Sequence, residues 1–104
     1  MELKRVVVTG LGALTPVGNN VAETWDNLVK GVSGAGPITH FDASKFKTHF
    51  ACEVKNFNGT DYIDRKELRK MDLYTQYAIA AAKEAVEDSG MDLEKEDLNR
   101  IGVI

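Results

Sequence analysis

The sequence is poor in cysteine: Cys52 is the only one among 104 residues. One cysteine cannot form an internal disulfide, so a reducing, cytoplasmic setting is expected. Long apolar runs are also missing. None approaches the roughly 20 residues of a membrane span, and the run near the amino terminus is shorter than the core of a signal peptide. These absences argue against a membrane protein and against a secreted, disulfide-stabilised one.

An excess of positive charge is missing too, because the formal net charge is −3 at pH 7. Proteins that bind nucleic acid usually carry a basic excess, so no nucleic-acid partner is expected. The 43% hydrophobic and 28% charged residues are ordinary for a globular protein, and the length suits one small domain rather than two. Composition alone therefore indicates no function.

The first pattern along the chain is a strand followed by a glycine-rich turn. Val6, Val7 and Val8 stand together without polar alternation, which predicts a strand covered on both faces, and Gly10 and Gly12 mark the turn. Residues 100–104 offer the only other good strand of this kind. We therefore predict an α/β fold with an incomplete sheet, in which residues 1–104 form the front piece of a larger α/β protein.

A first helix is expected after Asn20, an N-cap candidate with Glu23 three residues on, and it is expected to end at Gly31. Its apolar residues have the spacing of one helical face: Val21, Trp25, Leu28, Val29 and Val32.

Helical structure is expected again from Asp64, where Glu67 completes a capping box, with a bend or new start at Asp72 and an end at residues 89–90. A stripe rich in alanine predicts close packing against a neighbouring element: Tyr74, Tyr77, Ala78, Ala81, Ala82, Ala85 and Val86.

Residues 33–60 are expected to be largely irregular and to be anchored by phenylalanines. Within them, the alternation of Phe50, Cys52 and Val54 with polar or small residues predicts a short half-buried strand with these three on one face.

Glycines directly after a strand also suggest a dinucleotide-binding loop. That motif needs a third glycine three residues after Gly12, where this chain has Thr15, and a helix at once, where this chain has Pro16. Tight-turn chemistry is the better interpretation.

His40, His49 and Cys52 are potential zinc ligands, but their spacing matches no recognised ligand pair, and no fourth ligand stands out. We expect histidines at or near the surface, a packed and inert thiol, and neither a metal nor a cofactor.

The most informative charged cluster consists of Arg65, Lys66, Arg69 and Lys70, here called the basic patch. On a helix, residues four apart lie one turn apart, so the four side chains gather while Glu67 points elsewhere. A solvated helix face is the plain alternative. On an acidic chain, however, such a patch would direct an acidic partner to one place.

Together these stretches resemble the amino-terminal quarter of the bacterial β-ketoacyl-acyl-carrier-protein synthases, most closely the type II elongating enzymes. The motifs that carry the resemblance run in the family's order over essentially the whole chain: Arg5-Val-Val-Val-Thr-Gly-Leu-Gly12, Thr15-Pro-Val-Gly18, Trp25, His40-Phe41-Asp42, Phe50-Ala51, Arg65-Lys66-Glu67, Arg69-Lys70-Met71-Asp72, Ser89-Gly90 and Arg100-Ile101-Gly102.

The resemblance implies a thiolase-like fold, five-layered in the complete enzyme, and a homodimer that acts as an acyltransferase in fatty acid biosynthesis. Such enzymes condense malonyl and acyl groups, both carried on acyl carrier protein, in a decarboxylating Claisen reaction. They use a cysteine nucleophile, two histidines and an oxyanion hole. In the family these residues lie beyond residue 104, so no catalytic role falls on Cys52, His40 or His49.

The resemblance also implies a role for the basic patch. Lys66, Arg69 and Lys70 match positions with which the family contacts its acidic carrier protein, and Arg65 lies beside them. We predict these three as carrier-protein-binding residues. Two alternatives stay open: a non-catalytic carrier-binding module, and a paralogue without the nucleophile, such as a chain-length factor.

Overall fold

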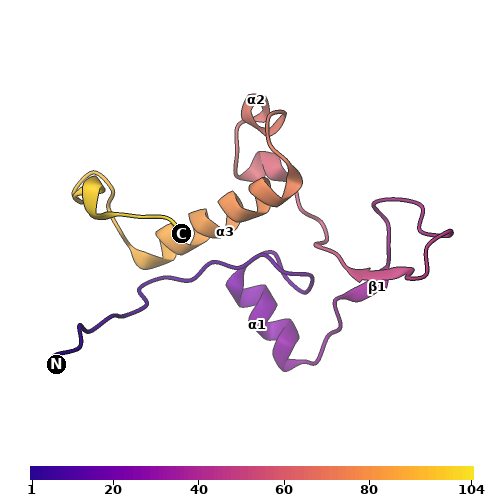
Figure 1. The fold of residues 1–104 in the computed structure, drawn as a ribbon, viewed down its shortest axis with the longest axis horizontal. Helices are drawn as coiled ribbons and strands as arrows, with labels where there is room; N and C mark the ends of the chain where they lie inside the picture. Colours follow the sequence, from indigo (N-terminus) through magenta and orange to yellow (C-terminus); the bar gives the residue numbers. More distant parts are fainter.

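The longest helix, α3 (Leu73–Ser89), is the spine of the computed structural model, which describes residues 1–104. Along the chain it is preceded by α1 (Val21–Val29), β1 (Ala35–Pro37), β2 (Phe50–Cys52), the 3-10 turn η1 (Gly59–Asp61) and the one-turn helix α2 (Arg65–Leu68), and it is followed by the 3-10 turn η2 (Leu98–Arg100). Figure 1 shows α1 and the amino-terminal segment on one side of α3, α2 near its start, and the β hairpin projecting beyond. None of the helices combines the length and apolar character needed to cross a membrane.

Helix α1 begins and ends where the sequence predicts. The Asn20 side chain accepts a hydrogen bond from the Glu23 backbone N–H at 2.8 Å, which satisfies one of the free donors of the first turn. The Glu23 carboxylate reaches back to the Asn19 N–H at 3.4 Å, one residue earlier than a capping box places it. Gly31 follows the helix with φ of +71°, a conformation that favours glycine.

The second helical stretch is divided into α2 and α3, as the predicted new start at Asp72 requires. Gly90 closes α3 in the left-handed conformation, with φ of +68°. The predicted capping box at Asp64 is wrong: its side chain makes no capping hydrogen bond, and Glu67 instead pairs with Lys70. Nor does Glu67 point away from the basic patch.

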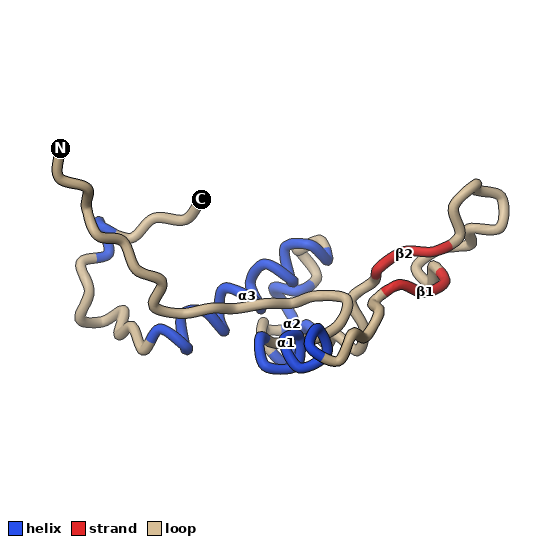
Figure 2. Tube along the Cα trace, turned by 90° about the horizontal axis from the view of Figure 1, so that it is seen from below, coloured by secondary structure: helices blue, strands red, loops and turns tan.

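The alanine-rich stripe of α3 is confirmed only in part. Gly10 and Gly12 lie so near Ala81 and Ala85 that a Cβ on either glycine would overlap backbone atoms of α3. Most other members of the stripe are exposed, and the buried residue of α3 is Ala80, which lies outside the predicted stripe. Figure 2 shows the amino-terminal segment following α3 as an extended, unpaired stretch. The glycines are therefore needed for close approach to a helix.

The two predicted buried strands are not formed. The only sheet pairs β1 with β2, and the valines of residues 6–8 are largely exposed, as is Ile104. Residues 98–100 form η2, and residues 101–104 are irregular. A strand forms only against a neighbour that supplies backbone donors and acceptors, and no segment of this chain takes that place.

The hairpin corrects a further expectation. Strand β2 lies within the segment that is predicted to form a short strand, residues 50–54. Its antiparallel partner β1 lies in the part of residues 33–60 that is expected to be irregular. The faces of β2 are also reversed: Phe50 is 67% exposed and Cys52 is exposed, whereas Ala51 between them is half-buried. Among the phenylalanines, Phe57 does anchor the segment, stacked on Tyr62 with a centroid distance of 5.7 Å.

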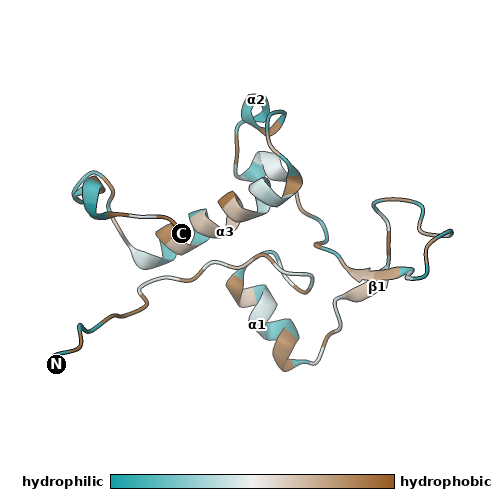
Figure 3. Ribbon diagram, viewed as in Figure 1, coloured by the Kyte–Doolittle hydropathy of each residue, from teal (hydrophilic) through white to brown (hydrophobic).

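Much of the apolar surface of the chain is exposed to solvent. Trp25 and Leu28 of the predicted apolar face of α1 are 67% and 55% exposed, and the only buried residue of that helix is Thr24. Figure 3 shows further apolar stretches along the amino-terminal segment. Only five of 104 residues are buried. The radius of gyration is 17.4 Å, against about 13 Å for a compact domain of this length.

Candidate functional site

The basic patch lies on α2 and the turn that follows it. Helix α2 is a single turn, closed by backbone hydrogen bonds from Glu67 and Leu68 to the Asp64 carbonyl at 2.9 and 3.0 Å. All four basic side chains are exposed. Figure 1 shows α2 standing out from the body at the start of α3, so the patch can meet a partner without obstruction by the rest of the chain.

One member of the patch has a neighbouring carboxylate. Lys70 Nζ lies 3.2 Å from Glu67 Oε1, and the two side chains are 71% and 50% exposed. Exposed ion pairs of this kind contribute little to stability, because water screens the two charges and both side chains lose conformational freedom. Lys70 can therefore leave Glu67 for a more acidic partner. No ion pair forms at Lys66 or Arg69.

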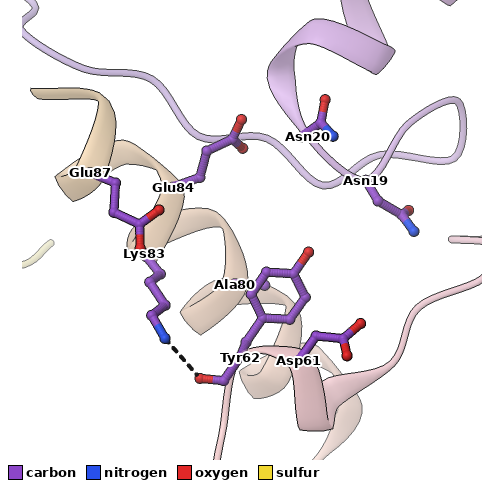
Figure 4. Close-up of a pocket in the computed structure, with 8 residues that line it drawn as sticks. All are labelled: Asn19, Asn20, Asp61, Tyr62, Ala80, Lys83, Glu84 and Glu87. Atoms are coloured by element: carbon purple, nitrogen blue, oxygen red, sulfur yellow. Dashed lines mark hydrogen bonds between the residues drawn. The ribbon is translucent and has the colours of Figure 1, made fainter.

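A polar pocket of ≈ 250 Å³ lies between the end of η1, helix α3 and the start of α1. Figure 4 shows its eight lining residues: Asn19, Asn20, Asp61, Tyr62, Ala80, Lys83, Glu84 and Glu87. Lys83 Nζ donates to the Tyr62 carbonyl at 3.4 Å, which links α3 to the end of η1. Three carboxylates and one lysine make the pocket acidic, so it does not extend the basic patch.

The most engaged carboxylate of this pocket has a structural role. Glu84 accepts hydrogen bonds from the Ala13 and Val21 backbone N–H groups, at 3.0 and 2.9 Å, one with each oxygen. One turn later, Asp88 accepts from the Leu11 N–H at 2.9 Å. The two carboxylates thus hold the amino-terminal segment and the first turn of α1 against α3.

This arrangement also decides against a phosphate site at the glycines. The N–H groups of Leu11 and Ala13, which a phosphate would need, already donate to Asp88 and Glu84. Two carboxylates beside the loop would also repel an anion.

His40, His49 and Cys52 are not brought to one point. His40 Nε2 lies 3.2 Å from Glu53 Oε2, whereas the His49 ring contacts the Phe46 carbonyl oxygen. Both histidines lie at the surface, as expected. Cys52 is exposed, so the predicted packed thiol is wrong. No group of three metal-ligating side chains is assembled in the chain.

Sequence reasoning missed three side chains that organise the structure: Glu84, Glu53 and Lys55. Glu53 accepts from the Thr39 N–H and hydroxyl, both at 2.7 Å, and the backbone bond is the largest cause that lowers its pKa. Lys55 Nζ donates to the carbonyls of Pro16, Gly34 and Glu53. Of the three, only Glu84 had a sequence indication, since with Asp88 it flanks the alanine stripe at i, i+4 spacing.

Comparison with known proteins identifies the family of the chain. The family model described as "Beta-ketoacyl synthase, N-terminal domain" matches residues 3–104. The chain is 54% identical over 100 residues to the 3-oxoacyl-[acyl-carrier-protein] synthase 2 of Staphylococcus aureus (strain COL), which covers 96% of this chain and 24% of that protein. It is 50% identical over 103 residues to the enzyme of the same name from Vibrio harveyi, with 99% and 25% covered.

Comparison with a solved structure supports the same family. The ishigamide ketosynthase/chain length factor superposes with a TM-score of 0.77 at 41% identity, over 85% of this chain and 22% of that one. The chain spans about a quarter of the length of the curated relatives that it matches. Its helices and short hairpin are those of a thiolase-like ketosynthase fragment. Residues 3–104 belong to the β-ketoacyl synthase family, in its amino-terminal domain.

Proposed function

We propose that this chain is the amino-terminal part of an elongating β-ketoacyl-acyl-carrier-protein synthase. The complete enzyme, an acyltransferase of fatty acid biosynthesis, condenses malonyl and acyl groups that are both delivered on acyl carrier protein, with release of carbon dioxide. The observation that carries this proposal is the 54% identity to a synthase of that name over 96% of the chain. We further propose a cytoplasmic homodimer that needs no cofactor.

The chemistry itself is assigned to residues outside this chain. Cys52 lies on an exposed hairpin, and His40 and His49 each contact a different neighbour. The three side chains make no hydrogen bond with one another, although a cysteine nucleophile needs a base beside it.

The contribution of this chain is to bind the carrier protein through the basic patch. Lys66, Arg69 and Lys70 are exposed on and just after a protruding one-turn helix, and Arg65 adds a fourth positive charge. Because the chain as a whole is acidic, this local excess of cations would orient an acidic carrier during encounter.

The paralogue reading is not favoured. The structural neighbour, a ketosynthase/chain length factor, is 41% identical, whereas the curated relatives at 50–54% identity are synthases. A cysteine at the family's nucleophile position in the full-length protein, followed by two histidine motifs, separates the two readings.

Replacing Lys66, Arg69 and Lys70 together by alanine in the full-length enzyme tests the binding role. We expect the KM for carrier-bound substrates to rise about tenfold, since three exposed charge contacts of about 0.5 kcal/mol each are lost. The salt dependence of that KM should fall as well. Steady-state kinetics between low and physiological ionic strength measure both.

The control for this experiment is self-acylation from a small acyl thioester, which needs no carrier. Its rate should be unchanged. If both substrates are affected equally, the patch is structural and the proposed binding role is wrong.

A further inference from the structure

Helix α2 packs against the rest of the chain through one of its side chains, that of Leu68. Of its four residues only Leu68 is half-buried; the other three are exposed. A four-residue helix has almost no stability of its own. The position of the basic patch therefore depends on what Leu68 packs against.

Leu68 packs on Gly59, which is buried in η1. A Cβ placed on Gly59 would lie 2.7 Å from Leu68 Cδ2 and 2.6 Å from Gln76 Oε1, so glycine is the largest residue that fits without a shift. The Gln76 amide also donates to the Met71 carbonyl at 3.3 Å, in the turn that follows the patch. Leu68, Gly59 and Gln76 are here called the α2 seat.

The seat is itself fixed to α3. Gln76 belongs to that helix, and Lys83 Nζ donates to the Tyr62 carbonyl just after η1. Phe57, just before η1, stacks on Tyr62 and meets Tyr77 of α3 edge-on at a centroid distance of 4.9 Å. Contacts thus run from the spine of the structure through η1 to Leu68.

We propose that the α2 seat positions the basic patch for carrier-protein binding, so that Gly59, Leu68 and Gln76 act as positioning residues. This inference rests on the proposed function of the patch. The three residues carry no charge and need not touch the carrier. They set where the charges of Lys66, Arg69 and Lys70 stand relative to the rest of the enzyme.

Gly59→Ala and Leu68→Ala in the full-length enzyme test the inference. In Gly59→Ala the added Cβ would crowd the ends of the Leu68 and Gln76 side chains, so the contact that holds α2 in place must be displaced. We expect the KM for acyl-carrier-protein substrates to rise about threefold, part of the effect of deleting the charges. The kcat and the rate with a small acyl thioester should not change.

Matched substitutions separate positioning from general damage. Gly36→Ala adds a methyl group where no atom lies within 4 Å. It should leave the KM unchanged. Leu68→Met keeps the volume of the side chain and should restore near wild-type KM.

Hydrogen exchange of the α2 amides gives a readout that needs no carrier. The Glu67 and Leu68 amides, which bond to the Asp64 carbonyl, should exchange faster in both seat variants and at the wild-type rate in Gly36→Ala.

The outcomes distinguish the two proposals. Unchanged KM in Gly59→Ala and Leu68→Ala would overturn the seat, even if the charge-deleted enzyme binds its carrier poorly. Unchanged KM in the charge-deleted enzyme would overturn the proposed function of the patch instead. A rise in KM for both substrate types in the seat variants, not rescued by Leu68→Met, would show general damage and would also overturn the seat.

Discussion

Individual carboxylates hold this structure together by accepting hydrogen bonds from the backbone. Glu84 and Glu53 each accept two donors, from segments far from them in sequence. Hydrogen bonds to an ionised group are stronger than neutral ones. No sequence pattern marks Glu53 for this role, because its partner Thr39 is chosen by the pairing of β1 with β2.

Glu53 makes the hairpin sensitive to acid. Because the Thr39 N–H and hydroxyl lower its pKa below the ordinary value of 4.5, the carboxylate stabilises the hairpin fully above that pH. This contribution is lost as the pH falls through the lowered pKa. In NMR titrations the Thr39 amide should therefore shift with a midpoint below 4.5.

Two substitutions check the assignment. Thr39→Val removes the hydroxyl donor and should move the midpoint upward, toward 4.5, whereas Glu53→Gln should abolish the titration at Thr39. A Thr39 amide that still titrates in Glu53→Gln would assign the effect to another group.

The elements show which parts of the fold the sequence could predict. The ends of α1 and α3 follow from Asn20, Gly31 and Gly90, because caps depend on local backbone geometry. Helical periodicity predicts the contact that Ala81 and Ala85 make, but not the burial of Ala80. The predicted strands at residues 6–8 and 100–104 are not formed, and the predicted faces of β2 are wrong, since pairing and burial depend on neighbours that local patterns do not specify.

The contact between the amino-terminal segment and α3 should tolerate no side chain at position 12. A Cβ on Gly12 would overlap the Ala81 carbonyl, and both sides of the contact are backbone, which cannot rotate away. We expect Gly12→Ala to destabilise the full-length protein by about 2 kcal/mol or more. Denaturant unfolding measures the change.

Gly36→Ala, in the projecting hairpin, is the matched control, because nothing lies within 4 Å of a Cβ there. Its stability should stay within about 0.5 kcal/mol of wild type. Equal stability of the two alanine variants would contradict the close approach.

As a whole, the molecule exposes more surface than its size allows for a compact protein. Its accessible surface is 8928 Å², against about 5,800 Å² for a folded monomer of 11.4 kDa. The open face of α1 and the unpaired residues 6–8 account for part of the excess. The basic patch, by contrast, comes from one short segment, so its clustering and exposure could be predicted from the sequence. Its role in carrier binding stays a prediction.

The isolated 104-residue chain should therefore lack cooperative stability. With only five buried residues and no large side chain fully buried, the hydrophobic gain cannot offset the chain entropy of about 1–2 kcal/mol per residue. Circular dichroism during heating should show a broad, shallow change. A sharp melt of the monomeric chain would contradict this expectation.

The long reach of the Glu84 and Asp88 hydrogen bonds has a consequence during synthesis. Ala13 and Leu11 leave the ribosome 71 and 77 residues ahead of the carboxylates that hold them. At about 5–20 residues per second, the nascent chain waits roughly 4–15 s for these partners. During that interval the Leu11 and Ala13 N–H groups have only water as a partner, so the amino-terminal segment reaches its place late in synthesis, after α3 has emerged.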